Sequence, residues 1–133
     1  MQQSQQEKPA EILKIFLKAY QITEDKGKIK PIEDIETPLI LVENIENFKE
    51  NCFWVNIKNL WILIAKVPPV VLTKGDFILF REKNKWGMFK YLGEEKEEFI
   101  LTDAKEKRKT KVKKDIIFSL SLFGKILRVQ NKV

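Results

Sequence analysis

The sequence predicts a mainly β protein, with an antiparallel and partly barrel-like sheet that is preceded by one amphipathic helix. Two observations lead to this fold class. Beyond residue 38 the chain consists of short runs rich in Ile, Val, Phe and Trp, separated by Gly, Pro, Asn or charged residues at the spacing typical of β proteins. Before that point, only one segment has the apolar period of a helix. We therefore divide the chain into an N-terminal helix and connector (residues 1–37) and a β domain (residues 38–133).

The predicted helix covers residues 9–20. Ile12, Phe16 and Tyr20 fall on one face at helical spacing, while charged residues fall on the opposite face. Residues 21–37 contain a glycine, a proline, mixed charges and few apolar side chains, so we expect a connector there. One helix is too little for a DNA-binding helix-turn-helix, and the sequence therefore predicts no such motif.

Eight strands are predicted in the rest of the chain. Each is a short run of β-branched, aromatic or other apolar residues bounded by turn formers, with no further long helix between them. The expected strands are Leu39–Val42, Phe53–Ile57, Leu60–Ala65, Phe77–Arg81, Trp86–Leu92, Phe99–Thr102, Thr110–Lys113 and Phe123–Val129. We expect the second and fourth of them to contribute to the core.

The composition excludes several classes of function. The chain has 133 residues, a net charge of +6, no histidine and a single cysteine, Cys52. The usual general base and the commonest metal ligand are therefore absent, and neither an internal disulfide nor a zinc cluster can form. We expect no cofactor, no metal and no small-molecule substrate. The longest apolar run, Leu60–Ala65, is too short to span a membrane, and the polar N-terminus lacks a signal peptide, so the sequence predicts a soluble cytoplasmic protein.

Five features follow one another in an informative order. An apolar strand that starts at Phe53 leads into Leu60-Trp61, then into Pro68-Pro69, a Gly75-Asp76 turn and a second apolar strand, Phe77 to Phe80. A Gly-Asp turn between apolar strands is common in β domains, so the weight lies in the order of the features.

This order resembles the C-terminal domain of LexA and the lambda-type phage repressors. There an apolar strand runs into a Ser-Met pair, a Pro-containing loop, a Gly-Asp turn and a second strand. Met88 to Leu92 matches the family's strand that carries a catalytic lysine, and Phe123 to Leu127 matches its closing strand. The resemblance covers residues 38–130 and implies the sheet fold shared by LexA and signal peptidases.

The resemblance places Leu60 at the catalytic serine and Lys90 at the lysine base of this family. A leucine cannot attack a peptide bond. The Ala-Gly or Cys-Gly bond that the family cleaves is also missing, because the five glycines follow Lys, Trp, Leu, Lys and Phe. The chain is thus predicted to be a pseudo-peptidase without enzymatic activity. Strand alternation equally allows Lys90 to be an ordinary lysine on a solvent-facing surface.

Seven cations lie in ten residues and are opposed only by Glu106. They are Lys105, Lys107, Arg108, Lys109, Lys111, Lys113 and Lys114. Such a run can hold the phosphates of nucleic acid. It can also protect an exposed sheet edge from aggregation. Four glutamates between residues 94 and 98 dilute the positive charge, which favours edge protection.

The resemblance implies a dimerisation or partner-binding module in transcriptional regulation. The chain would form a homodimer or associate with another regulator, because family domains pair through their sheets and often through the last strand, here residues 123–129. Trp61 stands where the family has an active-site methionine, so it is expected to fill the cleft or to form part of a partner-binding patch. The alternative is a small β-barrel that binds nucleic acid through the run from Lys105 to Lys114.

Overall fold

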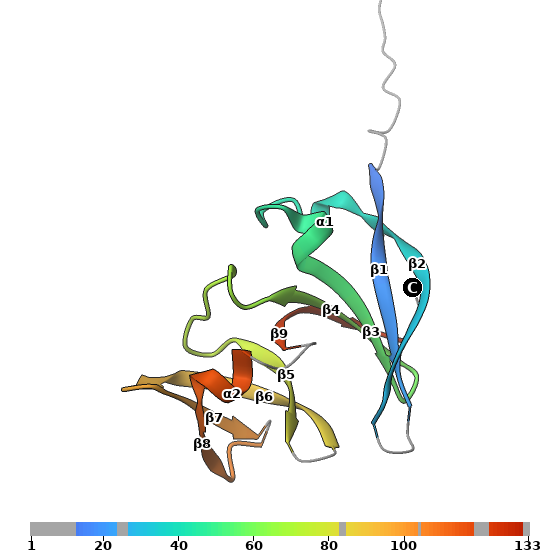
Figure 1. The fold of residues 1–133 in the computed structure, drawn as a ribbon. Helices are drawn as coiled ribbons and strands as arrows, with labels where there is room; N and C mark the ends of the chain where they lie inside the picture. Colours follow the sequence, from blue (N-terminus) through green and yellow to red (C-terminus); the bar gives the residue numbers. More distant parts are fainter. Residues whose placement is uncertain (1–12, 24–26, 83–84, 104, 119–122, 132–133) are drawn as a thin grey trace, which may run out of the picture.

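The protein folds as one bent, mixed β-sheet (Figure 1). The computed structural model describes residues 13–23, 27–82, 85–103, 105–118 and 123–131. The nine strands lie in the order β2-β1-β3-β4-β9-β5-β6-β7-β8, and all neighbours are antiparallel except β1 and β3, which are parallel. The strands are β1 (Lys14–Ile22), β2 (Ile29–Pro38), β3 (Cys52–Ile57), β4 (Leu60–Lys66), β5 (Phe77–Glu82), β6 (Lys85–Glu95), β7 (Glu98–Asp103), β8 (Lys109–Lys113) and β9 (Gly124–Gln130). The prediction of a mainly β fold is confirmed, and the sheet is open, with β2 and β8 at its edges.

The predicted N-terminal helix is wrong over its described part. Residues 14–22 form β1, which pairs with β2 on one side and with β3 on the other. Leu17 and Ala19 are buried while Phe16 is 64% exposed, so the inward positions alternate with a period of two. Residues 9–12 of the predicted helix lie outside the described residues.

The predicted connector is also wrong, because most of it forms the edge strand β2. Its half-buried isoleucines, Ile29, Ile32 and Ile35, are three residues apart. Ile32 and Ile35 pack in the same cluster, and their spacing of three results from a register shift that inserts one extra residue into β2, whereas Ile29 packs in the cluster on the opposite face. A bulged edge strand therefore lacks the strict alternation by which a strand is identified from sequence.

The predicted strand Leu39–Val42 is not a strand. Leu39–Leu41 forms a short 3₁₀ helix, η1, and the following turns lead to the one-turn helix α1 (Phe48–Asn51). Val42 is buried beneath this segment. The remaining seven predicted strands coincide with β3 to β9 to within a few residues at each end. A second short helix, α2 (Lys114–Phe118), follows β8.

The tight turn at Lys58 and Asn59 sets the register of the β3–β4 hairpin. Both residues have positive φ, 48° and 69°, as a two-residue type I′ turn requires. The hairpin is buried on both faces, because Cys52 and Trp54 point to one face of the sheet and Phe53 and Val55 to the other. It therefore forms the centre of the core.

Three apolar clusters hold the sheet together. One lies on β5 to β7, where Ile78, Phe89 and Leu101 pack under the segment between β4 and β5. The second covers one face of β1, β3 and β4 under η1 and α1. The third fills the opposite face, where the sheet bends over itself and the indole N–H of Trp86 donates to the carbonyl of Gly27 at 3.0 Å. None of the helices in the described part of the chain is long and apolar enough to cross a membrane.

Candidate functional site

The structure does not bring Leu60 and Lys90 together. Leu60 is the first residue of β4, and Lys90 lies on β6, with β9 and β5 between these two strands in the sheet. The two residues therefore lie on strands that are three places apart in the sheet order. Lys90 Nζ instead donates to a carboxylate oxygen of Glu106 at 2.9 Å. This hydrogen bond also holds the pKa of Glu106 below its ordinary value.

The Gly-Asp turn is bound to β6 by backbone hydrogen bonds. Gly75 has φ +100°, a conformation that favours glycine. Its N–H donates to the carbonyl of Tyr91 at 2.8 Å, and the N–H of Tyr91 donates to the carbonyl of Asp76 at 2.7 Å. The Asp76 carboxylate accepts from the N–H of Thr73 at 2.7 Å and lies 3.3 Å from Lys125 Nζ. The turn thus fixes the end of the Pro-containing loop (residues 67–72) against β6 and β9.

The Pro-containing loop separates two hollows. A larger hollow of about 480 Å³ lies between this loop, residues 41–46 and β9. A smaller one of about 210 Å³ lies between the loop and β6. Val71 lines both and is 79% exposed at the surface.

The smaller hollow brings Lys114 of the basic run together with Glu94 and Tyr91, a grouping that the sequence did not predict. Lys114 Nζ forms an ion pair with Glu94 and lies 5.7 Å from the centre of the Phe99 ring. The bond to Glu94 raises the pKa of Lys114. Burial, followed by the charge of Glu94, raises the pKa of Tyr91. The two charged side chains that line this hollow, Lys114 and Glu94, are paired with each other.

Trp61 lies on β4 and is half-buried. It packs against the cluster formed by β1, β3 and β4, and its strand partner on β9 is Gln130. The structure therefore places Trp61 next to β9 and away from Lys90.

β9 is paired along only part of its second edge. On one side, β4 pairs with β9 from Gly124 to Gln130. On the other side, β5 pairs with only two residues, Gly124 and Lys125. Figure 1 shows β5 turning away while β9 continues along β4. Within the described chain, residues 126–129 therefore have no strand on this side, and Val129 is 43% exposed.

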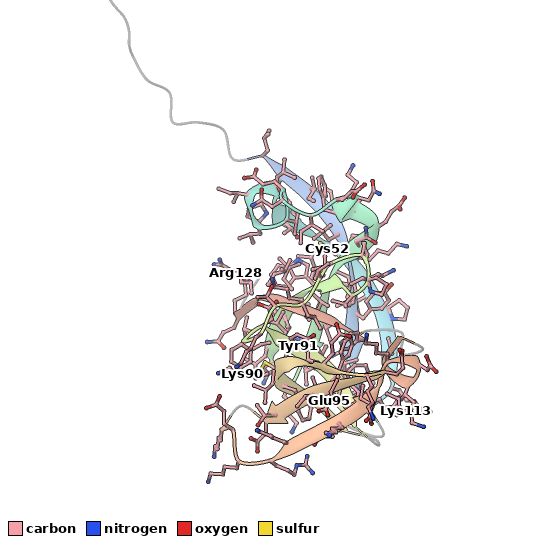
Figure 2. All side chains as sticks on the ribbon, turned by 90° about the vertical axis from the view of Figure 1, so that its left-hand side faces the viewer. Cys52, Lys90, Tyr91, Glu95, Lys113 and Arg128 are labelled. Atoms are coloured by element: carbon pink, nitrogen blue, oxygen red, sulfur yellow. The ribbon has the colours of Figure 1, made fainter. Side chains whose placement is uncertain are left out.

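The basic run forms the edge of the sheet and the turn that leads to it. Lys111 lies 3.5 Å from Glu95, and Lys114 pairs with Glu94, so the strand half of the run is partly neutralised. Lys113 lies opposite Glu98 at the same end of the sheet. Figure 2 shows Lys113 and Lys90 at opposite ends of the β6–β8 layer. The turn half, residues 105–109, is exposed at the Lys90 end.

Comparison of the chain with models of known protein families and with curated proteins gives no match. The resemblance to the repressor domains therefore rests on the ordered features of the sequence alone.

Proposed function

We propose that this chain is a non-catalytic dimerisation module related to the C-terminal domains of LexA-type repressors, and that it acts in transcriptional regulation. Two copies would pair through the open part of the β9 edge. The single observation that carries the proposal is the row of residues 126–129, which has a strand on one side only among the described residues. An unpaired strand edge is a template for another strand.

The residues at the two positions matched to the family's dyad support the non-catalytic part of the proposal. Leu60 has no nucleophilic atom, and Lys90 is engaged with Glu106 at 2.9 Å. A dyad would need a hydroxyl within about 3 Å of the lysine nitrogen. A binding function needs neither group.

The geometry of β9 favours a symmetric dimer. When the same strand of two copies pairs antiparallel across a two-fold axis, the contact closes after two copies and the two sheets become continuous. Val129 lies on the same face as Ile62, its partner on β4, and it is the exposed apolar residue of this edge. Its side chain would pack against the second copy near the axis.

Charged substitutions at Val129 test this arrangement. Light scattering of the unaltered protein should give the mass of a dimer. Val129→Glu and Val129→Lys should each give monomers, because like charges near the two-fold axis repel. An equimolar mixture of the two variants should restore a dimer through opposite charges. Val71→Glu is the matched control, because Val71 is 79% exposed but lies on the Pro-containing loop.

Two results would contradict the proposal in different ways. A monomer of the unaltered protein at high concentration would refute dimerisation. A dimer that tolerates both charges at Val129 but is lost with Val71→Glu would place the interface on the Pro-containing loop instead of on β9.

A further inference from the structure

A row of side chains crosses four strands on one face of the sheet. Phe77 of β5 pairs with Lys90 of β6, Lys90 with Thr102 of β7, and Thr102 with Lys109 of β8. Residues that pair directly in an antiparallel sheet point to the same face. The opposite face of these strands carries the buried cluster of Ile78, Phe89 and Leu101. The row therefore lies on the other face of the β5–β8 layer, where Leu79 and Trp86 belong to the third cluster but Phe77 and Lys109 are exposed.

The part of this face that the row occupies has exposed apolar surface among its cations. Phe77 is 43% exposed, and Met88, which lies two residues before Lys90 on the same face, is 37% exposed. Lys90 has 31% of its side-chain surface exposed. Exposed apolar side chains therefore lie beside a lysine on this face.

The described part of the β7–β8 connection, residues 105–108, places positive charge at the same end of the sheet. Two acids are engaged within this end: Asp103 accepts from the backbone N–H of Lys107 at 2.7 Å, and Glu106 accepts from Lys90 at 2.9 Å. Lys105, Lys107 and Lys109 are exposed, and the ion pairs described for this chain include none of the three. The glutamates at residues 94 and 95 bind cations at the other end of the layer. The dilution of charge expected from the sequence therefore applies to only half of the basic run.

A hydroxyl group without a partner lies in the middle of the row. The side-chain oxygen of Thr102 is buried and has no hydrogen-bond partner among the described residues, and the residue is 1% exposed. Burial of an unsatisfied hydroxyl costs free energy. A bound oxygen acceptor between Lys90 and Lys109 would satisfy this group once the lysine side chains move to admit it.

These features select one class of ligand. Successive side chains on one face of β8 are about 7 Å apart. Lys109, the first residue of β8, belongs to the row that ends at the aromatic ring of Phe77. Single-stranded nucleic acids combine phosphates, which lysines bind, with unpaired bases, which stack on aromatic rings. A duplex hides the faces of its bases, and an acidic peptide would use the lysines while leaving Phe77 without a role.

We propose that the row Phe77–Lys90–Thr102–Lys109, together with the basic turn, binds single-stranded nucleic acid. One base stacks on Phe77, and the phosphates lie along Lys90, Lys107 and Lys109. The ion pair between Lys90 and Glu106 is exposed, and such pairs contribute little, so a phosphate can replace the carboxylate. This site lies on β5 to β8 and does not depend on the pairing of β9.

Fluorescence anisotropy of the whole protein with a labelled oligothymidine, over a range of salt concentrations, tests the proposal. Binding should weaken with salt, by a slope of about 0.7 for each phosphate contact. Lys107→Gln and Lys109→Gln should each weaken binding and reduce the slope by roughly that amount. Phe77→Leu should weaken binding about tenfold without changing the slope, because stacking is lost while the charges stay.

Lys49→Gln is the matched control, because Lys49 is an exposed lysine on the helix α1, which packs against β1, β3 and β4 and not against β5 to β8. It should leave both affinity and slope unchanged. The proposal is overturned by absence of binding, or by binding that Lys49→Gln weakens as much as Lys107→Gln does. It is also overturned if an unlabelled duplex competes as well as a single strand while Phe77→Leu has no effect. Competition by polyglutamate at equal charge would show an acidic protein to be the ligand instead.

Discussion

At the scale of single residues, burial controls the chemistry of the only cysteine. Cys52 is 1% exposed, and burial raises the pKa of its thiol from 9.0 to about 11. The folded state therefore keeps the thiol proton at a pH where the unfolded chain has lost it. Because only the unfolded state is stabilised by ionisation in this window, the free energy of unfolding should fall between about pH 9 and about pH 11.

Urea denaturation at a series of pH values, for the unaltered protein and for Cys52→Ala, measures this effect. The alanine variant is less stable at neutral pH because it leaves a small cavity. The difference between the two proteins should shrink as the pH rises through the window, since only the cysteine contributes the titration. A difference that stays constant from neutral pH to pH 11 would show that the thiol is not desolvated.

The sequence shows where the charged residues lie along the chain, but it does not show which of them form ion pairs with one another. The basic run and the four glutamates between residues 94 and 98 are visible in the sequence itself. The sequence did not predict that Glu106, the one acid within the run, binds Lys90. The two residues are sixteen positions apart and meet only because the β6–β7 and β7–β8 pairings bring the turn over β6. Contacts of this kind depend on register, which a single sequence leaves open.

At the scale of elements, the strands buried on one or both faces were predicted and the N-terminal hairpin was not. In β1, Ile15, Leu17 and Ala19 face the core, yet Phe16 and Tyr20 add apolar residues at helical spacing. Both periods are therefore present in one segment, and tertiary pairing with β2 and β3 decides between them. The prediction of a strand at Leu39–Val42 was wrong for a related reason. A run of four apolar residues has no periodicity that would distinguish a strand from a 3₁₀ turn.

The edge strand β2 is joined to the core by a buried hydrogen bond. The indole N–H of Trp54 donates to the hydroxyl of Thr37 at 2.7 Å, and that hydroxyl donates to the carbonyl of Ile35 at 3.0 Å. Thr37→Val should lower the free energy of unfolding by about 1–3 kcal/mol, because the buried indole N–H loses its acceptor.

A double-mutant cycle with Trp54→Phe isolates this bond. In the phenylalanine background there is no N–H to satisfy, so Thr37→Val should cost clearly less than in the unaltered protein. Equal costs in both backgrounds would mean that Thr37 stabilises β2 through packing alone.

At the scale of the whole molecule, the two halves of the sheet meet at a short junction. β5 and β9 pair at two positions only, Ile78 with Lys125 and Leu79 with Gly124. Side chains strengthen the junction, because Leu79 of β5 and Trp86 of β6 belong to the cluster of Phe53, Val55 and Ile62. The backbone alone would leave β5–β8 as a separate unit, whereas this shared cluster joins it to β1–β4.

We therefore expect the molecule to unfold as one unit, and Leu79→Ala to destabilise both halves. Leu79 is fully buried, and its truncation should cost about 2–5 kcal/mol. Native-state hydrogen exchange should show the protection of amides falling by the same free energy in β3 and in β6, because both exchange through the same global opening.

Met88→Ala, at the position opposite Leu79 on β6, is the control, since Met88 is 37% exposed and its truncation should cost far less. If Leu79→Ala lowers protection in β5 to β8 while β3 and β4 keep theirs, the sheet consists of two units that unfold separately, and the short junction, not the shared cluster, determines the cooperativity of the fold.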